Sequence, residues 1–262
     1  MNIILMLIKE AVESLLRNFK TVRIKKNSLV DRKIHKSIIE DGIATIPNFL
    51  DDMECKSFRD EIDRQISNDS VNVWVDSDGA DNRIYFADKL NLKFEEFYNN
   101  PTINAMLSAY TGLVNPVGML LAARIDYKSG NLGSGGGWHR DSPITHQFKA
   151  ICYLNDVSSE NGPFQYIKAS HRKSDVIRSY FTRLFKPGQY RFSDMSVENY
   201  LSSNSDRYIT DLTAPKGTLV FADTKGIHRG KPIASGSRYV LFCYFWDKNI
   251  PENFNRLRQN KI

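Results

Sequence analysis

Residues 237–246, SRYVLFCYFW, are the part of this 262-residue chain that most strongly indicates its fold. The stretch is rich in β-branched and aromatic side chains, which favour β-strands. Four upstream stretches of seven to ten residues share this character and are separated by Gly, Pro, Asn and Asp. They are GMLLAARIDY (118–127), FKAICYLND (148–156), PFQYIKAS (163–170) and GTLVFAD (217–223). The series predicts an antiparallel barrel or sandwich, and a jelly roll in particular.

The residues before this strand-rich body predict helices. One helix is expected to begin at Asp51 or Asp52, because either carboxylate can cap its first turn. A second helical pattern over residues 93–112 is broken at Pro101 and closed at Gly112. The side chains expected to point inward from the first helix are Met53, Phe58, Ile62 and Ile66. The expected fold class is therefore α+β with a mainly β core and flanking N-terminal helices.

Length and composition predict one globular domain. With 41% apolar residues, the chain can fill a single core. We expect a basic N-terminal arm over residues 1–36 and one domain over residues 37–262. The three cysteines lie far apart and form no CxxC pair, which argues against a disulfide framework or a structural zinc site. A reducing, cytoplasmic location fits this usage.

The positive charge of the chain is confined to the arm. The formal charge is +6, and the first 36 residues hold nine Lys or Arg against three acidic residues. The remaining 226 residues carry 27 basic and 27 acidic side chains. A nucleic-acid groove would spread positive charge over the folded body, so no nucleic-acid partner is expected.

The arm itself has the pattern of an amphipathic helix. Its apolar residues recur at helical spacing over residues 4–19, and its uninterrupted apolar run, residues 3–8, is too short to span a bilayer. No positively charged segment precedes that run, which disfavours a signal peptide. Two interpretations stay open. The helix packs on the domain, or residues 1–26 make a peripheral contact with an anionic membrane.

A long insertion interrupts the strands over about residues 172–211. Within it, Ser174 is expected to cap a helix that Pro187 and Gly188 end. The insertion is either a lid over a binding site or a second small core. Its aromatic residues suit a lipid tail or a flat ring, and its arginines and lysine suit a carboxylate, a phosphate or a nucleotide sugar. The aromatic residues are Tyr180, Phe181, Phe185, Tyr190, Phe192, Tyr200 and Tyr208.

The stretch GGGWHRDSP, residues 135–143, holds the first candidate metal ligands. His139 is the only one of the five histidines with a carboxylate two residues later. On an extended backbone residues i and i+2 share a face, so His139 and Asp141 can point at one ion. Trp138 is expected to pack beside that ion. The glycines lack the Lys of a phosphate loop and are expected to form a flexible approach to the site.

A ferrous site of the facial-triad kind needs a second histidine. Two imidazoles and one carboxylate leave three positions open for a co-substrate and dioxygen. His228 is the best candidate, because it follows the predicted strand at 217–223. Arg238 comes ten residues later, and a planar guanidinium can hold the distal carboxylate of a dicarboxylate co-substrate.

In this order and spacing, the motifs resemble the phytanoyl-CoA dioxygenase family of Fe(II)/2-oxoglutarate oxygenases. The resemblance covers residues 41–247 and includes YLNDVSSENGPFQYIKASHR (153–172). It implies a double-stranded β-helix, Fe(II) held by His139, Asp141 and His228, and 2-oxoglutarate held by Arg238. It also implies weaker contacts with 2-oxoglutarate or substrate for Arg124 and Arg83. Gly230 departs from the pattern, because many members have a hydroxyl residue at that position.

The chemistry that this resemblance implies is hydroxylation of an aliphatic C–H of a small molecule, with 2-oxoglutarate and O2 as co-substrates. Halogenation is disfavoured, because Asp141 stands where halogenases of the family have a small residue. Two rival interpretations remain: a catalytically silent jelly roll that binds a ligand or partner, and a cupin-type isomerase or Zn/Mn enzyme. The second rival would not need Arg238 in the cavity.

Overall fold

The computed structural model describes residues 29–259 apart from 114, 142–147 and 187, together with residues 5, 8 and 12. Residues 1–26 of the arm predicted over residues 1–36 therefore lie almost wholly outside the described residues, and their packing stays a prediction. The expected boundary at residue 36 falls inside helix α2 (Arg32–Asp41), whose Ile38 is fully buried. None of the helices within the described residues is long and apolar enough to cross a membrane.

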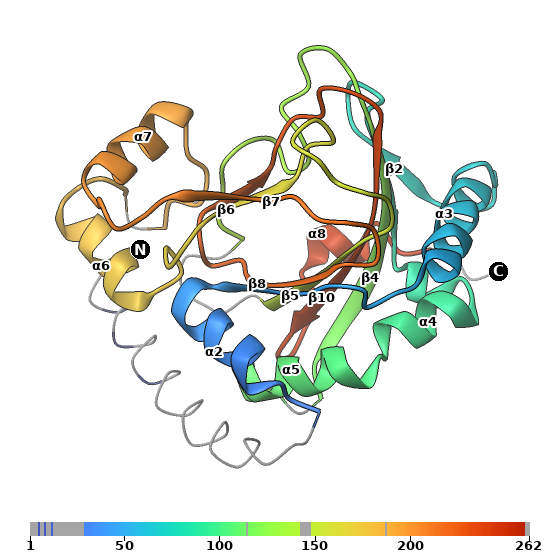
Figure 1. Ribbon diagram of the computed structural model, residues 1–262, viewed down its shortest axis with the longest axis horizontal. Helices are drawn as coiled ribbons and strands as arrows, with labels where there is room; N and C mark the ends of the chain where they lie inside the picture. The colour runs from blue at the N-terminus through green and yellow to red at the C-terminus, as the bar shows by residue number, and fades with distance from the viewer. Residues whose placement is uncertain are drawn as a thin grey trace.

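The described strands form two antiparallel sheets (Figure 1). In order across the larger sheet they are β1 (Ile43–Ile46), β8 (Leu219–Asp223), β5 (Phe148–Tyr153), β10 (Ser237–Trp246), β4 (Val117–Asp126), β3 (Asp81–Tyr85) and β2 (Val73–Val75). Across the smaller sheet they are β7 (Ile209–Leu212), β6 (Phe164–Ile167) and β9 (His228–Gly230). The stretch SRYVLFCYFW is β10, which lies centrally in the larger sheet and pairs along its whole length with β4. The expected jelly roll is confirmed.

Helices cover one face of the larger sheet. The helices after α2 are α3 (Asp52–Ile66), α4 (Leu92–Tyr98), α5 (Pro101–Thr111), α6 (Lys173–Phe181), α7 (Asp194–Ser202) and α8 (Glu252–Asn255), and a 3-10 turn, η1, spans Ala87–Lys89. Side chains alternate along β4, so Leu120 and Ala122 face the helices while Leu121 and Ala123 face the barrel interior. The chain thus has one core under the helices and a second inside the barrel.

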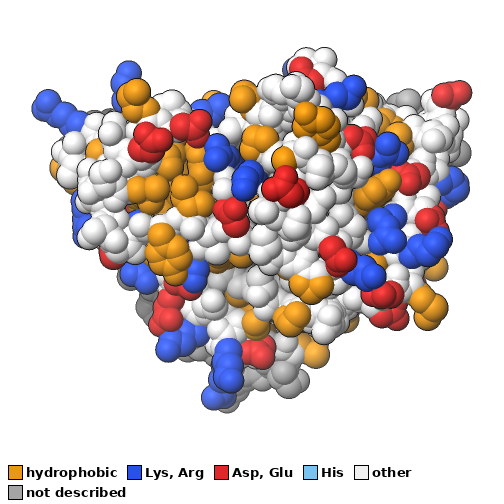
Figure 2. Space-filling model, turned by 45° about the horizontal axis from the view of Figure 1, so that its top comes forward, with side chains coloured by type: hydrophobic (Ala, Val, Ile, Leu, Met, Phe, Trp, Pro, Cys, Tyr) orange, Lys and Arg blue, Asp and Glu red, His pale blue; other side chains and the backbone are white. Residues whose placement is uncertain are grey.

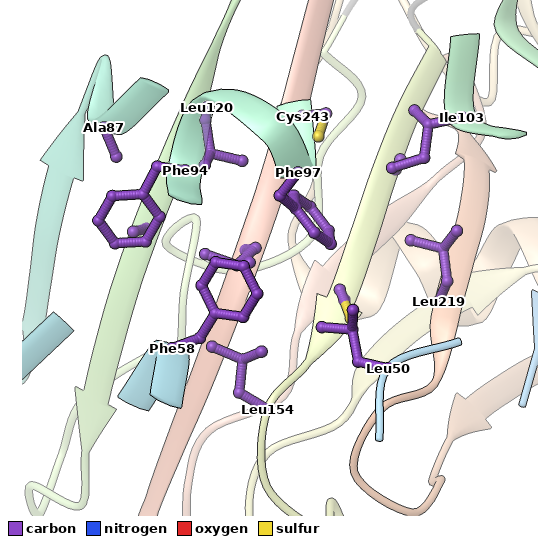
Figure 3. Packing of buried hydrophobic residues seen from close by; sticks show 14 of the residues in the cluster. Leu50, Phe58, Ala87, Phe94, Phe97, Ile103, Leu120, Leu154, Leu219 and Cys243 are labelled. Carbon is purple, nitrogen blue, oxygen red and sulfur yellow. The ribbon is translucent and has the colours of Figure 1, made fainter. Parts of the chain in front are cut away.

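The core under the helices is filled by aromatic rings. Figure 3 shows Phe58 from α3 and Phe94 and Phe97 from α4 turned toward one another above the sheet. The Phe58 ring centroid lies 5.9 Å from that of Phe94 and 5.6 Å from that of Phe97. Stacked and edge-on ring pairs of this kind stabilise a core beyond their buried area. The packing fixes the helical layer on the face of the larger sheet that points away from the barrel interior.

The predicted helices are largely confirmed. Asp51 caps α3 through the Glu54 amide, and the Glu54 carboxylate accepts the Asp51 amide in return, which completes a capping box. The inward position predicted for Met53 is wrong, because this side chain is 78% exposed and Cys55 is buried instead. The second pattern gives α4 and α5, and Gly112 ends α5 in the left-handed conformation.

The insertion forms a third hydrophobic core. Figure 1 shows α6 and α7 together at the opposite end of the molecule from α3 and α4. Helix α6 begins after Arg172 without a side-chain cap, so the cap predicted at Ser174 is wrong. Of the seven aromatic residues, four are buried in this core and three are exposed. The buried four are Tyr180, Phe185, Phe192 and Tyr200.

Candidate metal centre

Backbone pairing brings the two halves of the site together. His139 pairs antiparallel with His228 of β9, and each backbone N–H donates to the other's carbonyl at 2.9 Å. On the other side, Arg140 N–H donates to the Tyr190 carbonyl at 2.8 Å. Asp141 N–H donates to the Thr224 carbonyl at 3.0 Å. The segment with His139 and Asp141 is therefore an extended segment bonded on both sides, as the i, i+2 spacing predicts.

The three expected ligands face one point. His139, Asp141 and His228 offer donor atoms that all lie within 4.8 Å of one another. Nε2 of His139 is 3.6 Å from Oδ1 of Asp141, and Nε2 of His228 is 3.8 Å from Oδ2. Two imidazole nitrogens and one carboxylate on one side of an ion are the donor set of a facial ferrous triad. The donor chemistry and spacing fit such an ion.

The backbone fixes which nitrogen of each imidazole is free. Nδ1 of His139 lies 2.9 Å from the Gly137 carbonyl, and Nδ1 of His228 lies 2.9 Å from the Gly226 carbonyl. Only a protonated nitrogen can donate to a carbonyl, so both Nδ1 atoms carry the hydrogen and both Nε2 atoms keep a free lone pair. This outer hydrogen bond also orients each ring, as it does in most protein metal sites.

Burial keeps the ligands in the protonation states that bind metals. Burial, together with the nearby His139 ring, lowers the pKa of His228 to about 3. Burial also lowers the pKa of His139, although Asp141 opposes the shift. For Asp141 burial would raise the pKa, but Lys149 and the two imidazoles hold it well below its usual range. At neutral pH the set is two neutral imidazoles and a carboxylate.

The residues on either side of His139 point the other way. Trp138 is buried in the core of the insertion, with the Arg229 guanidinium carbon 4.3 Å from its ring centroid. Arg140 is almost fully buried, with its guanidinium carbon 5.7 Å from the ring centroid of Phe185 and 5.6 Å from that of Phe192. The predicted place of Trp138 beside the ion is therefore wrong, because strand alternation directs it away from His139.

The triad opens into a cavity of about 220 Å³. Leu121, Ile151 and Phe242 form apolar wall, and Tyr85, Tyr153 and Tyr244 also line the cavity. Arg191 brings the insertion to the cavity, whereas none of the seven aromatic residues of the insertion lines it within the described chain. The contact of the insertion with the cavity is therefore a charged side chain rather than an aromatic lid.

Two of the three predicted arginines reach this cavity. Arg238 is 2% exposed, and its Nε and Nη1 have no hydrogen-bond partner among the described residues. Arg83 of β3 also lines the cavity, and its guanidinium donates to Asp81, to the Tyr85 hydroxyl and to Ser134 Oγ. A Cβ at Gly230 would lie 3.1 Å from Arg238 Nη2 and 2.9 Å from Ser134 Cβ, so the absence of a side chain there leaves room for both.

Arg124 lies outside the cavity. It shares the helix-facing side of β4 with Ala122, where its guanidinium binds Asp63 of α3 and Asp126. The geometry therefore gives no support to a contact between Arg124 and a co-substrate in the cavity.

Lys149 is a residue of the site that sequence reasoning missed. It lies on β5, is 6% exposed, and its Nζ is 2.6 Å from Oδ2 of Asp141. Burial would lower the pKa of Lys149, but the Asp141 carboxylate raises it above its usual value. The signal was a lone lysine in FKAICY, on the same strand face as Ile151 and Tyr153, which line the cavity.

Fold and ligand set together define a double-stranded β-helix with a His-Asp-His cluster inside the barrel. The model of the phytanoyl-CoA dioxygenase (PhyH) family matches residues 38–239, and the chain belongs to that family. No curated protein matches the chain.

Solved structures share the fold at low identity. The epimerase SnoN from nogalamycin biosynthesis, in complex with Fe3+, alpha ketoglutarate and nogalamycin RO, has a TM-score of 0.61 at 15% identity, with 82% of each chain covered. HygX from Streptomyces hygroscopicus, with nickel, 2-oxoglutarate and hygromycin B bound, has a TM-score of 0.58 at 16% identity over 85% of this chain and 90% of that chain. EctD from S. alaskensis with bound Fe has a TM-score of 0.66 at 12% identity over 90% and 87%.

Proposed function

We propose that this chain is a non-haem Fe(II)- and 2-oxoglutarate-dependent dioxygenase that hydroxylates an aliphatic C–H of a small molecule. One observation carries the proposal: the donor atoms of His139, Asp141 and His228 meet in the same cavity as the buried guanidinium of Arg238, whose Nε and Nη1 have no partner among the described residues. When bound at such a site, ferrous iron couples the oxidative decarboxylation of 2-oxoglutarate by O2, to succinate and CO2, with insertion of one oxygen atom into a C–H bond.

Arg238 would hold the distal carboxylate of 2-oxoglutarate. Buried guanidinium hydrogens without a partner are costly, and a carboxylate that accepts two parallel hydrogen bonds from the Nη1–Nη2 edge would give Nη1 the partner that it lacks among the described residues. Arg83 and Ser134 stand beside this position, and their mutual hydrogen bond at 2.9 Å fixes the guanidinium at the cavity wall. The arrangement distinguishes this cavity from a cupin-type site that works without a dicarboxylate.

Asp141 indicates the type of reaction. A carboxylate at this position fills the place that a halide would need, which favours hydroxylation over halogenation. The structural neighbours include an epimerase and a carbocyclase, so the fold alone does not select a reaction. The apolar wall of Leu121, Ile151 and Phe242 suits the aliphatic part of a substrate and excludes water from it.

A small molecule is the expected substrate class. Figure 2 shows basic and acidic side chains interspersed over the visible face, without the continuous basic stripe that nucleic-acid binding requires. The cytoplasmic location and the peripheral membrane contact through residues 1–26 stay predictions.

Anaerobic titration tests the proposal. Fe(II) and 2-oxoglutarate together should give the wild-type protein a visible metal-to-ligand charge-transfer band. His228→Ala should lose the band because the ion loses one of its two imidazole ligands. Arg238→Met should keep metal binding but weaken 2-oxoglutarate about 30-fold or more, since charge-assisted hydrogen bonds contribute about 2 kcal/mol each at a buried site.

Arg124→Met is the matched control, because it removes a guanidinium that lies outside the cavity. It should titrate like the wild type. A band of wild-type intensity in His228→Ala would overturn the triad. Equal 2-oxoglutarate affinity in Arg238→Met and Arg124→Met would overturn the role of Arg238, and a wild-type protein without any band would favour the catalytically silent jelly roll.

A further inference from the structure

Lys149 places a positive charge directly beside a metal ligand. Its Nζ lies 2.6 Å from Asp141 Oδ2 and 4.2 Å from the ring centroid of Tyr244, whose hydroxyl it also contacts. A cation at this position repels a divalent ion that binds the same carboxylate. Metal binding alone therefore does not account for a buried lysine here, and the ammonium needs another function.

The cavity has a surplus of positive charge. Its lining includes four cationic side chains, Arg83, Lys149, Arg191 and Arg238, against one carboxylate, Asp141. One further carboxylate, Asp81, lies behind Arg83 and forms an ion pair with it. The segment 142–147, outside the described residues, has no acidic residue in its sequence. Among the described residues the surplus is two positive charges, and one of these belongs to the exposed Arg191.

The co-substrate does not remove this surplus. The two positive charges of a ferrous ion and the two negative charges of 2-oxoglutarate cancel. The cations would thus remain in excess in the loaded enzyme, and an uncompensated charge inside a protein is costly. Arg191 already donates to the carbonyls of Gly135 and Gly136, but among the described residues the Lys149 ammonium has only Asp141 and Tyr244 for its three hydrogens.

We propose that Lys149 binds an anionic group of the primary substrate, a carboxylate or a phosphate, next to the metal. The inference rests on the proposed function and names the substrate class of the same site. Because Nζ lies within hydrogen-bond distance of a metal ligand, the anionic group sits close to the C–H that reacts. Ile151 lies two residues further on the same strand face and offers apolar surface to the carbons that follow the anion.

Paramagnetic relaxation with small probes tests this proposal without knowledge of the substrate. The full chain, in excess over Mn2+ and saturated with 2-oxoglutarate, is titrated with inorganic phosphate, with acetate, and with acetamide as the neutral analogue of acetate. The relaxation rates of 31P and of the methyl protons report how close each probe comes to the ion. We expect a saturable enhancement for at least one anion and none for acetamide.

Substitutions of Lys149 test whether its ammonium group causes the relaxation enhancement. Lys149→Met should raise the dissociation constant of the bound anion at least ten-fold, whereas Lys149→Arg should keep most of the binding. Lys168→Met is the matched control, because Lys168 pairs with Asp41 and does not line the cavity. The anion with the lower dissociation constant identifies carboxylate or phosphate as the group recognised.

Three results would overturn the proposal: no saturable enhancement by either anion, equal enhancement by acetamide, or an anion affinity that Lys149→Met leaves within two-fold of the wild type. An enhancement that falls as 2-oxoglutarate is raised would also overturn it, because the probe would then occupy the co-substrate position. Absence of the Fe(II) and 2-oxoglutarate charge-transfer band would instead contradict the proposed function. The two failures are therefore distinguishable.

Discussion

At the scale of single residues, the imidazole of His139 has its place because residue 135 has no side chain. Gly135 adopts φ +91°, and a Cβ there would lie 2.6 Å from His139 Cε1. Gly137 adopts a similar φ of +86°, but a Cβ there would meet nothing within 4 Å. A comparison of substitutions at these two glycines therefore separates the effect of backbone strain from the effect of a contact with the metal ligand His139.

We predict that Gly135→Ala weakens metal binding while Gly137→Ala does not. Both variants should lose about 1 kcal/mol of unfolding free energy, because alanine is strained at positive φ. Only the Cβ at 135 displaces the imidazole, and misplacing a ligand in this way costs about ten-fold or more in metal affinity. Urea unfolding and a Co2+ titration measure the two effects. Equal metal affinities in the two variants would refute the contact.

Strand alternation explains which site residues were predictable from the sequence. His139 and Asp141 follow from the i, i+2 rule on an extended segment, which the structure contains. The same alternation places Arg124 on the helix-facing side of β4 with Leu120, so its predicted contact in the cavity has no support. Alternation also turns Lys149 toward the cavity, but its role depends on the neighbouring Asp141, which only the folded chain brings within reach.

At the scale of elements, the core of the insertion supports one side of the metal centre. Residues 190–192 pair with 138–140, and Phe192 N–H donates to the Trp138 carbonyl at 3.0 Å. Phe185 packs under this pairing, with its ring centroid 4.4 Å from that of Phe192. The insertion thus acts on the site through its packing and through Arg191, and the interpretation as a second small core describes it better than a lid.

Phe185→Ala should therefore lower both stability and metal affinity. Removing a ring that is 2% exposed leaves a cavity in the insertion core, which costs about 3–5 kcal/mol of unfolding free energy. Phe181→Ala removes the same ring from a position that is 69% exposed and should change stability by less than about 0.5 kcal/mol. Chemical unfolding and metal titration of both variants check the prediction. A destabilised Phe185→Ala that binds metal normally would show that the two regions are uncoupled.

Element length decides how much of the fold the sequence predicts. The long strands β4 and β10 and the helices α3 to α5 carry clear apolar patterns and appear as expected. Strands β2, β7 and β9 have only three or four residues, too few for a periodic signal, and none was predicted. Their positions depend on pairing with partners distant in the sequence, such as β6 with β9. The strand propensity of a segment does not indicate which distant segment it pairs with.

At the scale of the whole molecule, residues 168–172 join the helical layer to the insertion. Nε2 of His171 lies 3.2 Å from the Ile39 carbonyl, and Arg172 donates to the Glu40 carbonyl at 2.8 Å. The Ala169 N–H donates to the Asp41 carbonyl at 2.8 Å. The C-terminal end of α2 is therefore held by the chain that leads into α6, and a change of charge at this junction would act on both.

His171 makes this junction sensitive to acid. Burial lowers the pKa of His171 to about 4, assisted by Lys225 and Arg172 and opposed by Asp223 and the Ile39 carbonyl. In the unfolded chain a histidine has a pKa of about 6.5. Between these values the unfolded state binds more protons than the folded state, so stability is full above about pH 6.5 and falls as the pH drops toward 4, by about 3 kcal/mol from this group.

We predict that His171→Gln removes this part of the acid sensitivity. Urea unfolding of the metal-free protein at pH 7.5 and pH 4.5 should show the wild type losing about 2–3 kcal/mol more than the variant, since glutamine does not titrate. The comparison cancels the contributions of His139 and His228, which both proteins share. If His171→Gln and the wild type lose equal stability on acidification, the imidazole at this junction does not carry the proton-linked penalty.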